Sequence, residues 1–171
     1  MHKFFRLFIL PTGISLFFAT QILAQAVSMP FGNLSHDTTL PVEIVSDSFT
    51  VSQNRGTAEF LGNVVVGQGT MRLSAEKVLV KYSEKDGQPD NSEIDSMTAS
   101  GGVTLVSGDE AAEADTAVYS IEKGTIVMEG NVLLTQGSSA IAGQKMVVNL
   151  DDGSARMEGR VKTIFKTGGS E

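Results

Sequence analysis

The chain has 171 residues, with 20 acidic and 13 basic side chains, a formal net charge of −7 and no cysteine. Nucleic-acid binding rewards clustered Lys and Arg, and attachment to anionic lipid by charge needs the same, so this composition argues against both functions. Without cysteine the chain has no disulfide and no thiol nucleophile, and its apolar core alone must hold the fold.

The N-terminal segment, residues 1–26, has the features of an export signal. Lys3 and Arg6 precede an apolar run, and Ala24 and Ala26 form the small-x-small pattern that signal peptidase requires. An uncleaved membrane anchor is the alternative, but Pro11 and its polar neighbours interrupt the run, whereas a spanning helix needs about 20 mostly apolar residues. We therefore expect export with cleavage after Ala26. The predicted divisions of the chain are a signal peptide over residues 1–26, a flexible leader over residues 27–40, one domain over residues 41–166 and a tail over residues 167–171.

A glycine–valine pattern repeats along the predicted domain. Each of its glycines is followed at the second position by valine, and the last three are evenly spaced: Gly62, Gly101, Gly130 and Gly159. The residues two and four positions before each glycine are apolar, which is the period-two alternation of strands with one apolar face. The stretch from Ser46 also matches the stretch from Ala114, position for position. This self-similarity predicts a stack of equivalent units.

The alternation changes phase by one position near Glu76, and again around Asp115 and Gln144. A slip of this kind is typical of a β-bulge, so we expect every layer to bend at the same height. The repeated glycines in mid-strand are explained by the same bend or by a close approach of two backbones, and we assign them no ligand role. The first repeat is longer because Ser83–Asp95 adds about ten polar residues, as an insertion at a surface turn does.

No segment has a useful apolar stripe of period 3.6, and turn residues separate runs of about ten residues. We therefore predict an all-β domain of stacked, bent two-stranded layers, folded over a continuous apolar lining. Such a stack exposes unpaired strands at both ends. The first strand, Pro41–Asp47, carries one charge between apolar residues, and the last, Ala155–Lys166, also alternates, so either could accept another strand by β-augmentation.

The sequence contains no recognisable catalytic or metal-binding set. His36, the one histidine after the predicted signal, has no second ligand at usable spacing. Asp109 and Glu110 fall at a predicted turn, where solvated charge is expected, and Asp151–Gly153 has the form of a turn rather than of a calcium loop. We therefore predict that the protein is not an enzyme and uses no metal or cofactor, and that it binds an apolar ligand or another protein, or forms a scaffold.

The segments "PVEIVSD" and "AEFLGNVVVGQGTMRLSAEKVLVKY", in this order after a signal peptide, resemble the OstA-like (LptA) family of periplasmic lipopolysaccharide transport proteins. The likeness extends from Pro41 to Lys166. It implies a half-open antiparallel β-jelly roll, which agrees with the repeat. It further implies a periplasmic carrier that shields the lipid A acyl chains of lipopolysaccharide in a hydrophobic groove between the inner and outer membranes.

The resemblance also implies partners. Members of the family join head to tail with each other, with an LptC-like inner-membrane protein at one end and with an LptD-like outer-membrane translocon at the other, which suits edge-strand pairing. Two alternatives remain open: an inner-membrane-anchored homologue in the same transport system, and a β-scaffold that assembles without a ligand. An enzyme acting on envelope lipids is the weakest alternative, because no polar groups converge in the predicted groove.

The lipid-contacting residues of the family correspond to Val42 and Ile44 in the opening strand and to Tyr119 and Ile121 further on. A family phenylalanine corresponds less directly to Leu105, because the insertion lies nearby. The alternation adds other inward positions. The full set expected to bind lipid is Val42, Ile44, Phe60, Val64, Leu73, Val80, Leu105, Tyr119, Ile121 and Leu134. On sequence alone, an ordinary place in the core explains these residues equally well.

Overall fold

The computed structural model describes residues 27–30, 40–85 and 87–165. The predicted signal peptide with its cleavage site, His36 and the predicted tail lie outside the described residues. The elements in chain order are β1 (Val27–Pro30), β2 (Glu43–Val45), β3 (Ser48–Ser52), the 3-10 turn η1 (Gln53–Arg55), β4 (Thr57–Gln68), β5 (Met71–Lys85), β6 (Gln88–Ser107), β7 (Glu110–Ser120), β8 (Thr125–Gln136), β9 (Ser139–Asn149), β10 (Ser154–Glu158) and β11 (Lys162–Ile164).

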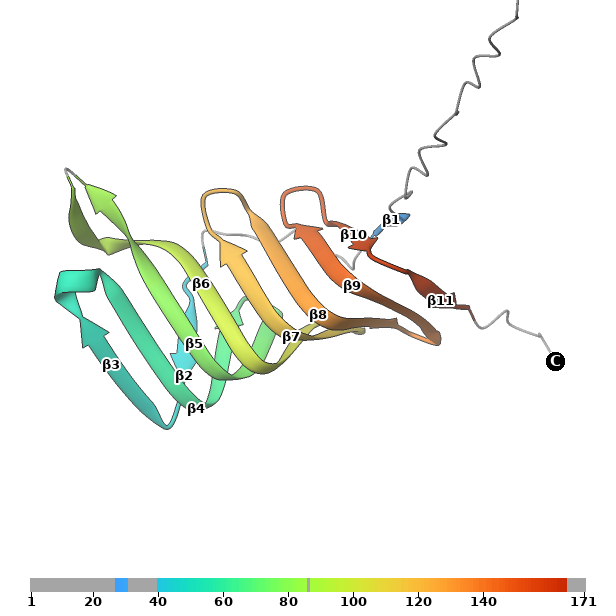
Figure 1. Ribbon diagram of the computed structural model, residues 1–171, viewed down its shortest axis with the longest axis horizontal. Coiled ribbons are helices and arrows are strands. Elements are labelled where there is room, and N and C mark those ends of the chain that lie inside the picture. The colour runs from blue at the N-terminus through green and yellow to red at the C-terminus, as the bar shows by residue number, and fades with distance from the viewer. Residues whose placement is uncertain (1–26, 31–39, 86, 166–171) are drawn as a thin grey trace, which may run out of the picture.

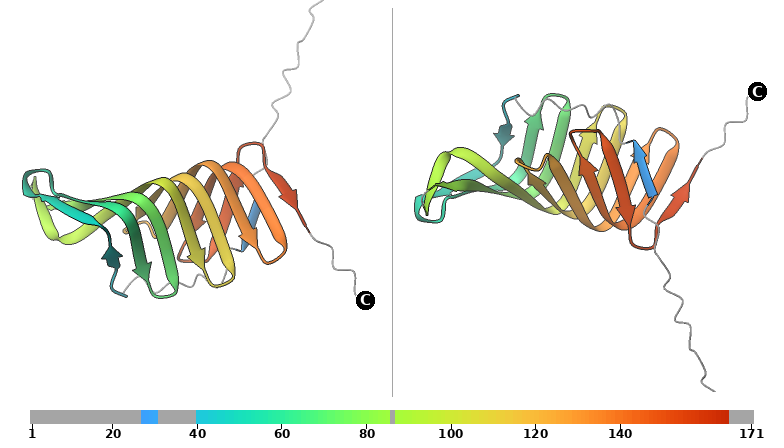
Figure 2. Two further views of the ribbon diagram at one scale, coloured as in Figure 1. Left: turned by 90° about the horizontal axis from the view of Figure 1, so that it is seen from below. Right: turned by 90° about the horizontal axis from the view of Figure 1, so that it is seen from above.

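The strands of the described chain all belong to one sheet in the order β1-β10-β9-β8-β7-β6-β5-β4-β2, while β3 also pairs with β4 and β11 with β9. The strand pairs are antiparallel throughout. Figures 1 and 2 show the strands crossing the long axis one after another, with β2 and β3 towards one end and β10 and β11 at the other. The predicted all-β fold of antiparallel layers is confirmed, and residues 27–30 of the expected leader form β1.

Each layer bends at a corner where two residues on one strand face a single residue on the next. In β4 the register shifts between Leu61 and Val64, and the same shift recurs in β6 and β8. Both bulged residues of every corner have positive φ, a region that favours glycine and asparagine. These pairs are Gly62 and Asn63 (78° and 48°), Gly101 and Gly102 (86° and 73°), Gly130 and Asn131 (82° and 50°), and Gly159 and Arg160 (79° and 46°).

The single residue opposite a corner lies directly against the glycine. A Cβ added to Gly101 would lie 2.6 Å from the Cβ of Glu76, and at Gly159 it would lie 2.8 Å from the Cβ of Gln144. Asp115 lies in the same way against Gly130. The predicted bends at Glu76, Asp115 and Gln144, and the close approach at the repeated glycines, are therefore both confirmed.

Side-chain hydrogen bonds close two of the corners. Asn63 Nδ2 donates to Asp47 Oδ2 at 2.8 Å, and Asn131 Nδ2 donates to Asp115 Oδ2 at 3.0 Å. These two bonds occupy matching positions in the two stretches that the sequence shows to be alike. Matching backbone bonds occur at the opposite ends of the layers, where the amides of Tyr82 and Leu150 donate to the carbonyls of Gly56 and Gly124 at 2.9 and 2.8 Å.

The insertion forms a hairpin rather than an irregular turn. It lengthens β5 and β6, whose pairing continues to Lys85 opposite Gln88, with register shifts beside Tyr82. The hairpin lies against η1, and a Cβ built on Gly56 would stand 2.6 Å from the Cβ of Pro89. The insertion therefore lies beside η1, near the end of the stack that contains β3 (Figure 1).

Candidate functional site

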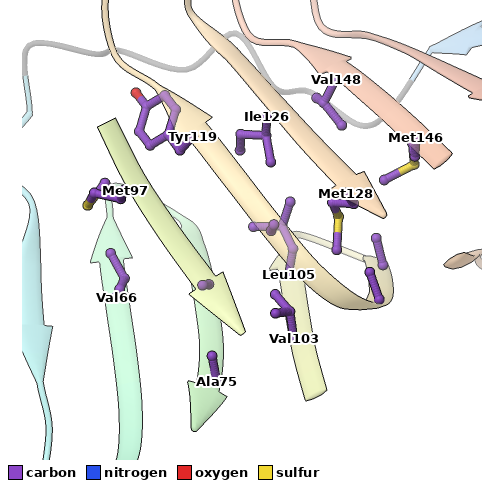
Figure 3. Close-up of a cluster of buried hydrophobic side chains, with 14 of the residues drawn as sticks. Val66, Ala75, Met97, Val103, Leu105, Tyr119, Ile126, Met128, Met146 and Val148 are labelled. Carbon is purple, nitrogen blue, oxygen red and sulfur yellow. The ribbon is translucent and has the colours of Figure 1, made fainter. Parts of the chain in front are cut away.

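The interior between the two halves of the bent sheet is the candidate site. Inward side chains alternate along every long strand, and buried apolar residues extend from Ala58 in β4 to Met157 in β10. Figure 3 shows part of this cluster, with Leu105 close to Ile126 and Met128. The halves are joined along one side by the corners, whereas along the other side they end in separate turns between strands.

A cavity of about 30 Å³ lies inside this interior, enough for roughly two or three water molecules. Both halves of the sheet line it: Val66, Gln68, Met71, Leu73 and Leu105 from one half, and Val78, Met97, Ala99, Ala117, Tyr119 and Ile126 from the other. The lining is almost entirely apolar. An acyl chain needs more room than this cavity provides, so binding one requires the two halves to move apart.

The ten residues expected to bind lipid all lie in the interior or pack against it. Five are buried in the core, namely Val64, Val80, Leu105, Tyr119 and Leu134. The other five are partly buried and pack on that core, namely Val42, Ile44, Phe60, Leu73 and Ile121. The structure brings Leu73, Leu105 and Tyr119 together on the cavity wall. It also pairs Ile44 with Val66, another wall residue.

Sequence reasoning missed some wall residues. Gln68 was not expected to face inwards because it is polar, although the alternation of Val64 and Val66 continues to it. Its Nε2 donates to the carbonyl of Leu40 at 2.9 Å. Ala117 was also absent from the predicted set, and its only signal is its place two positions before Tyr119.

The expectation that both carboxylates at the β6–β7 turn are solvated is wrong for Glu110. Asp109 is exposed, but Glu110 takes an inward position of β7 and is only 5% exposed. Gln136 Nε2 donates to Glu110 Oε1, while Oε2 has no hydrogen-bond partner among the described residues. Ser107 and Gln68 are buried at equivalent ends of β6 and β4, so a polar row ends the apolar interior on this side.

Tyr119 is an aromatic residue of the wall whose hydroxyl is buried without a hydrogen-bond partner among the described residues. Burial, and to a smaller extent the negative charge of Asp151, raises the pKa of Tyr119 above its ordinary value. The folded state therefore favours the neutral phenol. Its contribution to stability is complete below the unfolded pKa and is lost as the pH rises through the folded pKa.

Replacing Tyr119 with phenylalanine is expected to raise the free energy of unfolding at neutral pH by about 1 kcal/mol, because it removes an unsatisfied buried oxygen. The variant should also lose less stability than the parent as the pH rises above about 10, the ordinary pKa of a phenol. Urea unfolding at several pH values measures both effects. Tyr82→Phe, at a half-buried position, is the control for removal of a phenol hydroxyl. An equal alkaline loss in Tyr119→Phe and the parent would contradict the prediction.

The two ends of the stack differ. At the first end, β2 and β3 have no strand on their outer side within the described chain, and Val45 and Phe49 are 68% and 56% exposed. At the other end β11 is likewise uncovered, with Ile164 and Phe165 57% and 69% exposed, whereas β10 is paired with β1. The expected open edges are thus present at β2, β3 and β11, but not at β10.

The described part of the chain contains no helix long and apolar enough to cross a membrane. In the same residues no three His, Asp or Glu side chains gather as a metal site would require.

The geometry of stacked bent layers is shared with known proteins. The profile of the family described as "LptA/(LptD N-terminal domain) LPS transport protein" matches residues 43–154. This chain belongs to that family. The resemblance noted from the two sequence motifs is therefore confirmed, and the family is one of transport proteins rather than enzymes.

Individual relatives agree with this assignment to the LptA/LptD N-terminal family. An uncharacterized protein of Rhizobium meliloti (strain 1021) is 33% identical over 113 residues, which cover 65% of this chain and 61% of that protein. The lipopolysaccharide export system protein LptA of Escherichia coli (strain K12) is 35% identical over 68 residues, which cover 40% of this chain and 36% of that protein. The chain thus spans about a third to three fifths of the length of these curated relatives.

The fold also matches a solved structure of a family member. LptH of Pseudomonas aeruginosa is described as the LptA-homologous periplasmic component of the lipopolysaccharide transport device. It superposes with a TM-score of 0.66 at 17% identity, covering 77% of this chain and 99% of that chain. This likeness shows that the two proteins share a fold.

Proposed function

We propose that this LptA-family chain is a periplasmic carrier, exported with cleavage after Ala26, that binds the acyl chains of lipopolysaccharide and helps to move them from the inner to the outer membrane. The observation that carries the proposal is the unbroken apolar interior, which extends from partly buried Ile44 at one end of the stack to Met157 at the other. Every repeat adds another section to the same interior.

The energetics of acyl-chain burial support a site without charged groups. Each CH₂ that leaves water contributes about 0.8 kcal/mol, so several acyl chains gain most of their binding energy from a long apolar surface. An acidic protein is therefore able to carry a phosphorylated lipid. The chain contains no cysteine, so no disulfide holds the two halves of the sheet together, and lipid can separate them along the side opposite the corners.

The proposed carrier works by joining other proteins of the same fold. Exposed backbone on β2, β3 and β11 supports strand pairing at either end, with a second copy, with an LptC-like inner-membrane protein or with an LptD-like outer-membrane translocon. Half-buried apolar side chains at these ends, such as Ile44, would allow the interior to continue from one protein into the next.

A photo-crosslinking amino acid at Ile44 or Ile121 is expected to capture lipopolysaccharide in cells, because both side chains are partly buried against the interior. The matched controls are the exposed neighbours Glu43 and Glu122. Crosslinked species are detected by immunoblotting for lipopolysaccharide. Capture confined to the controls, or absent at all four positions, would contradict the proposal and favour a scaffold without ligand, for which a closed interior is also sufficient.

A further inference from the structure

The N-terminal strand β1 lies at the end of the stack where the chain finishes. It pairs antiparallel with β10, placing Val27 opposite Met157 and Ser28 opposite Arg156. The next strand along the chain, β2, is at the opposite end of the sheet order. Residues 27–30 therefore lie beside the C-terminal strand β10 and not beside β2, the next strand in the sequence (Figure 1).

The place that β1 occupies has an equivalent earlier in the repeat. β10 and the first half of β4 are the same part of the repeat, because each leads into a Gly-x corner, with φ of 78° and 48° in β4 and 79° and 46° after β10. On β4 this edge is taken by β5, which places Val78 opposite Phe60 and Val80 opposite Ala58. β3 pairs with the other edge of β4 in the same register, with Phe49 opposite Phe60 and Val51 opposite Ala58. Phe60 and Ala58 correspond in the repeat to Met157 and Ala155.

The register of β1 on β10 is the register of β3 on β4. Val27 and Met29 lie opposite Met157 and Ala155, as Phe49 and Val51 lie opposite Phe60 and Ala58. Both strands are antiparallel to their partner, and both alternate apolar, polar, apolar: Val27-Ser28-Met29 and Phe49-Thr50-Val51.

β3 is the repeat equivalent of the β5 segment that pairs with the first half of β4, because both strands pair with β4 in one register on its two edges. A second copy that continues the stack head to tail would therefore place its β3 on the outer edge of β10, as β5 lies on β4, in the same direction and register as β1. The position is filled by β1. We propose that β1 is an internal cap that imitates β3 of the next copy, so that a second copy can complete its pairing at this end only after β1 has left. This inference deepens the head-to-tail assembly in the proposed function and rests on it.

The cap covers only half of the edge. β11 corresponds to the part of β4 that pairs with β2, and it has no strand on its outer side in the described chain. A second copy therefore has a place to begin pairing, through its β2 on β11, before its β3 displaces β1. The cap itself is a poor template for further pairing, since it is very short and ends at Pro30, which has no backbone N–H to donate.

Cysteine pairs can test the cap directly, because the native chain has no cysteine. Directly opposed residues of antiparallel strands have Cα atoms about 4.5–5.5 Å apart, within the range of a disulfide. Ser28→Cys with Arg156→Cys locks β1 onto β10. Thr50→Cys with Arg156→Cys, in a chain lacking residues 27–30, instead joins β3 of one copy to β10 of the next; within one chain these residues lie at opposite ends of the sheet.

Sedimentation velocity over a concentration series measures self-association. We expect deletion of residues 27–30 to lower the concentration at which half of the protein is associated at least tenfold. Oxidation of the Ser28→Cys, Arg156→Cys chain should raise this concentration at least tenfold, and reduction should restore the parent value. The Thr50→Cys, Arg156→Cys chain should form disulfide-linked ladders that become fewer when β1 is retained. Thr50→Cys with Glu113→Cys, an exposed position inside the stack, is the control and should give no ladder.

Equal association of the Ser28→Cys, Arg156→Cys chain in its oxidised and reduced states would overturn the inference. Because this comparison uses a single polypeptide, it remains decisive even if the chain lacking residues 27–30 folds poorly. A ladder unaffected by the presence of β1 would overturn it as well. Lipid capture at Ile44 is measured on the same variants, because β1 pairs with the outer edge of β10 and should leave capture unchanged. Loss of capture with normal ladders therefore refutes the carrier function, and normal capture without ladders refutes the cap.

Discussion

A chain with Ile44→Asp is expected to fail to support delivery of lipopolysaccharide to the cell surface when the native protein is depleted. Ile44 packs on the core beside Val66, a residue of the cavity wall, so an aspartate there places a charge in the interior that we propose to hold acyl chains. An unpaired carboxylate is costly to bury, and a loss of about 1.4 kcal/mol already lowers binding tenfold. Newly made lipopolysaccharide should then accumulate at the inner membrane.

The adjacent residue provides the control for this experiment. Val45 lies on the same edge strand but on its outer face and is 68% exposed, so Val45→Asp adds the same charge without entering the interior. Val45→Asp should restore surface delivery. Purified samples of both variants are compared by thermal unfolding and sedimentation, which verify folding and assembly. Normal delivery by folded Ile44→Asp would refute the carrier function.

Alanine at Gly101 is expected to destabilise the fold by about 3 kcal/mol, as two effects of about 1–2 kcal/mol add, namely positive φ for a residue with a Cβ and overpacking. Gly101 has φ of 86°, and its new Cβ would lie 2.6 Å from the Cβ of Glu76, which no rotamer change can move aside. Urea unfolding measures the loss.

Gly102 separates the two effects. It has φ of 73°, but nothing lies within 4 Å of an added Cβ, so Gly102→Ala should show only the backbone cost of about 1–2 kcal/mol. Equal losses at Gly101 and Gly102 would mean that the close approach of neighbouring layers has no energetic role.

The repeated parts of the structure could be predicted from the sequence because several copies of the same pattern agree with each other. The spacing of Gly62, Gly101, Gly130 and Gly159 located every corner, and the slip at Glu76 identified the strand that carries one residue where its neighbour carries two. Inward positions followed from period two, as for Leu105 and Tyr119, because a strand cannot change the face of one residue without shifting the rest.

The parts that occur once could not be predicted in the same way. β1 is short, and its sequence does not recur elsewhere in the repeat. Its pairing also joins residues far apart in the sequence, such as Val27 and Met157. The burial of Glu110 was missed because turn composition indicates solvation, whereas the strand begins one position earlier than the turn residues suggest. The insertion has too few apolar residues to show a strand pattern, and its contact of Pro89 with Gly56 is tertiary.

The corner at Gly101 and Gly102 differs from its neighbours in a way that bears on how the roll opens. The corners at Asn63 and Asn131 are each tied by a side-chain hydrogen bond, but Gly102 has no side chain with which to make one. Two adjacent glycines also have the widest backbone freedom of any pair. The strand with this corner, β6, also carries Met97, Ala99 and Leu105 to the cavity wall. The stack is therefore tied by side-chain hydrogen bonds at the two flanking corners and has more backbone freedom at the corner of β6, the strand that contributes to the apolar cavity.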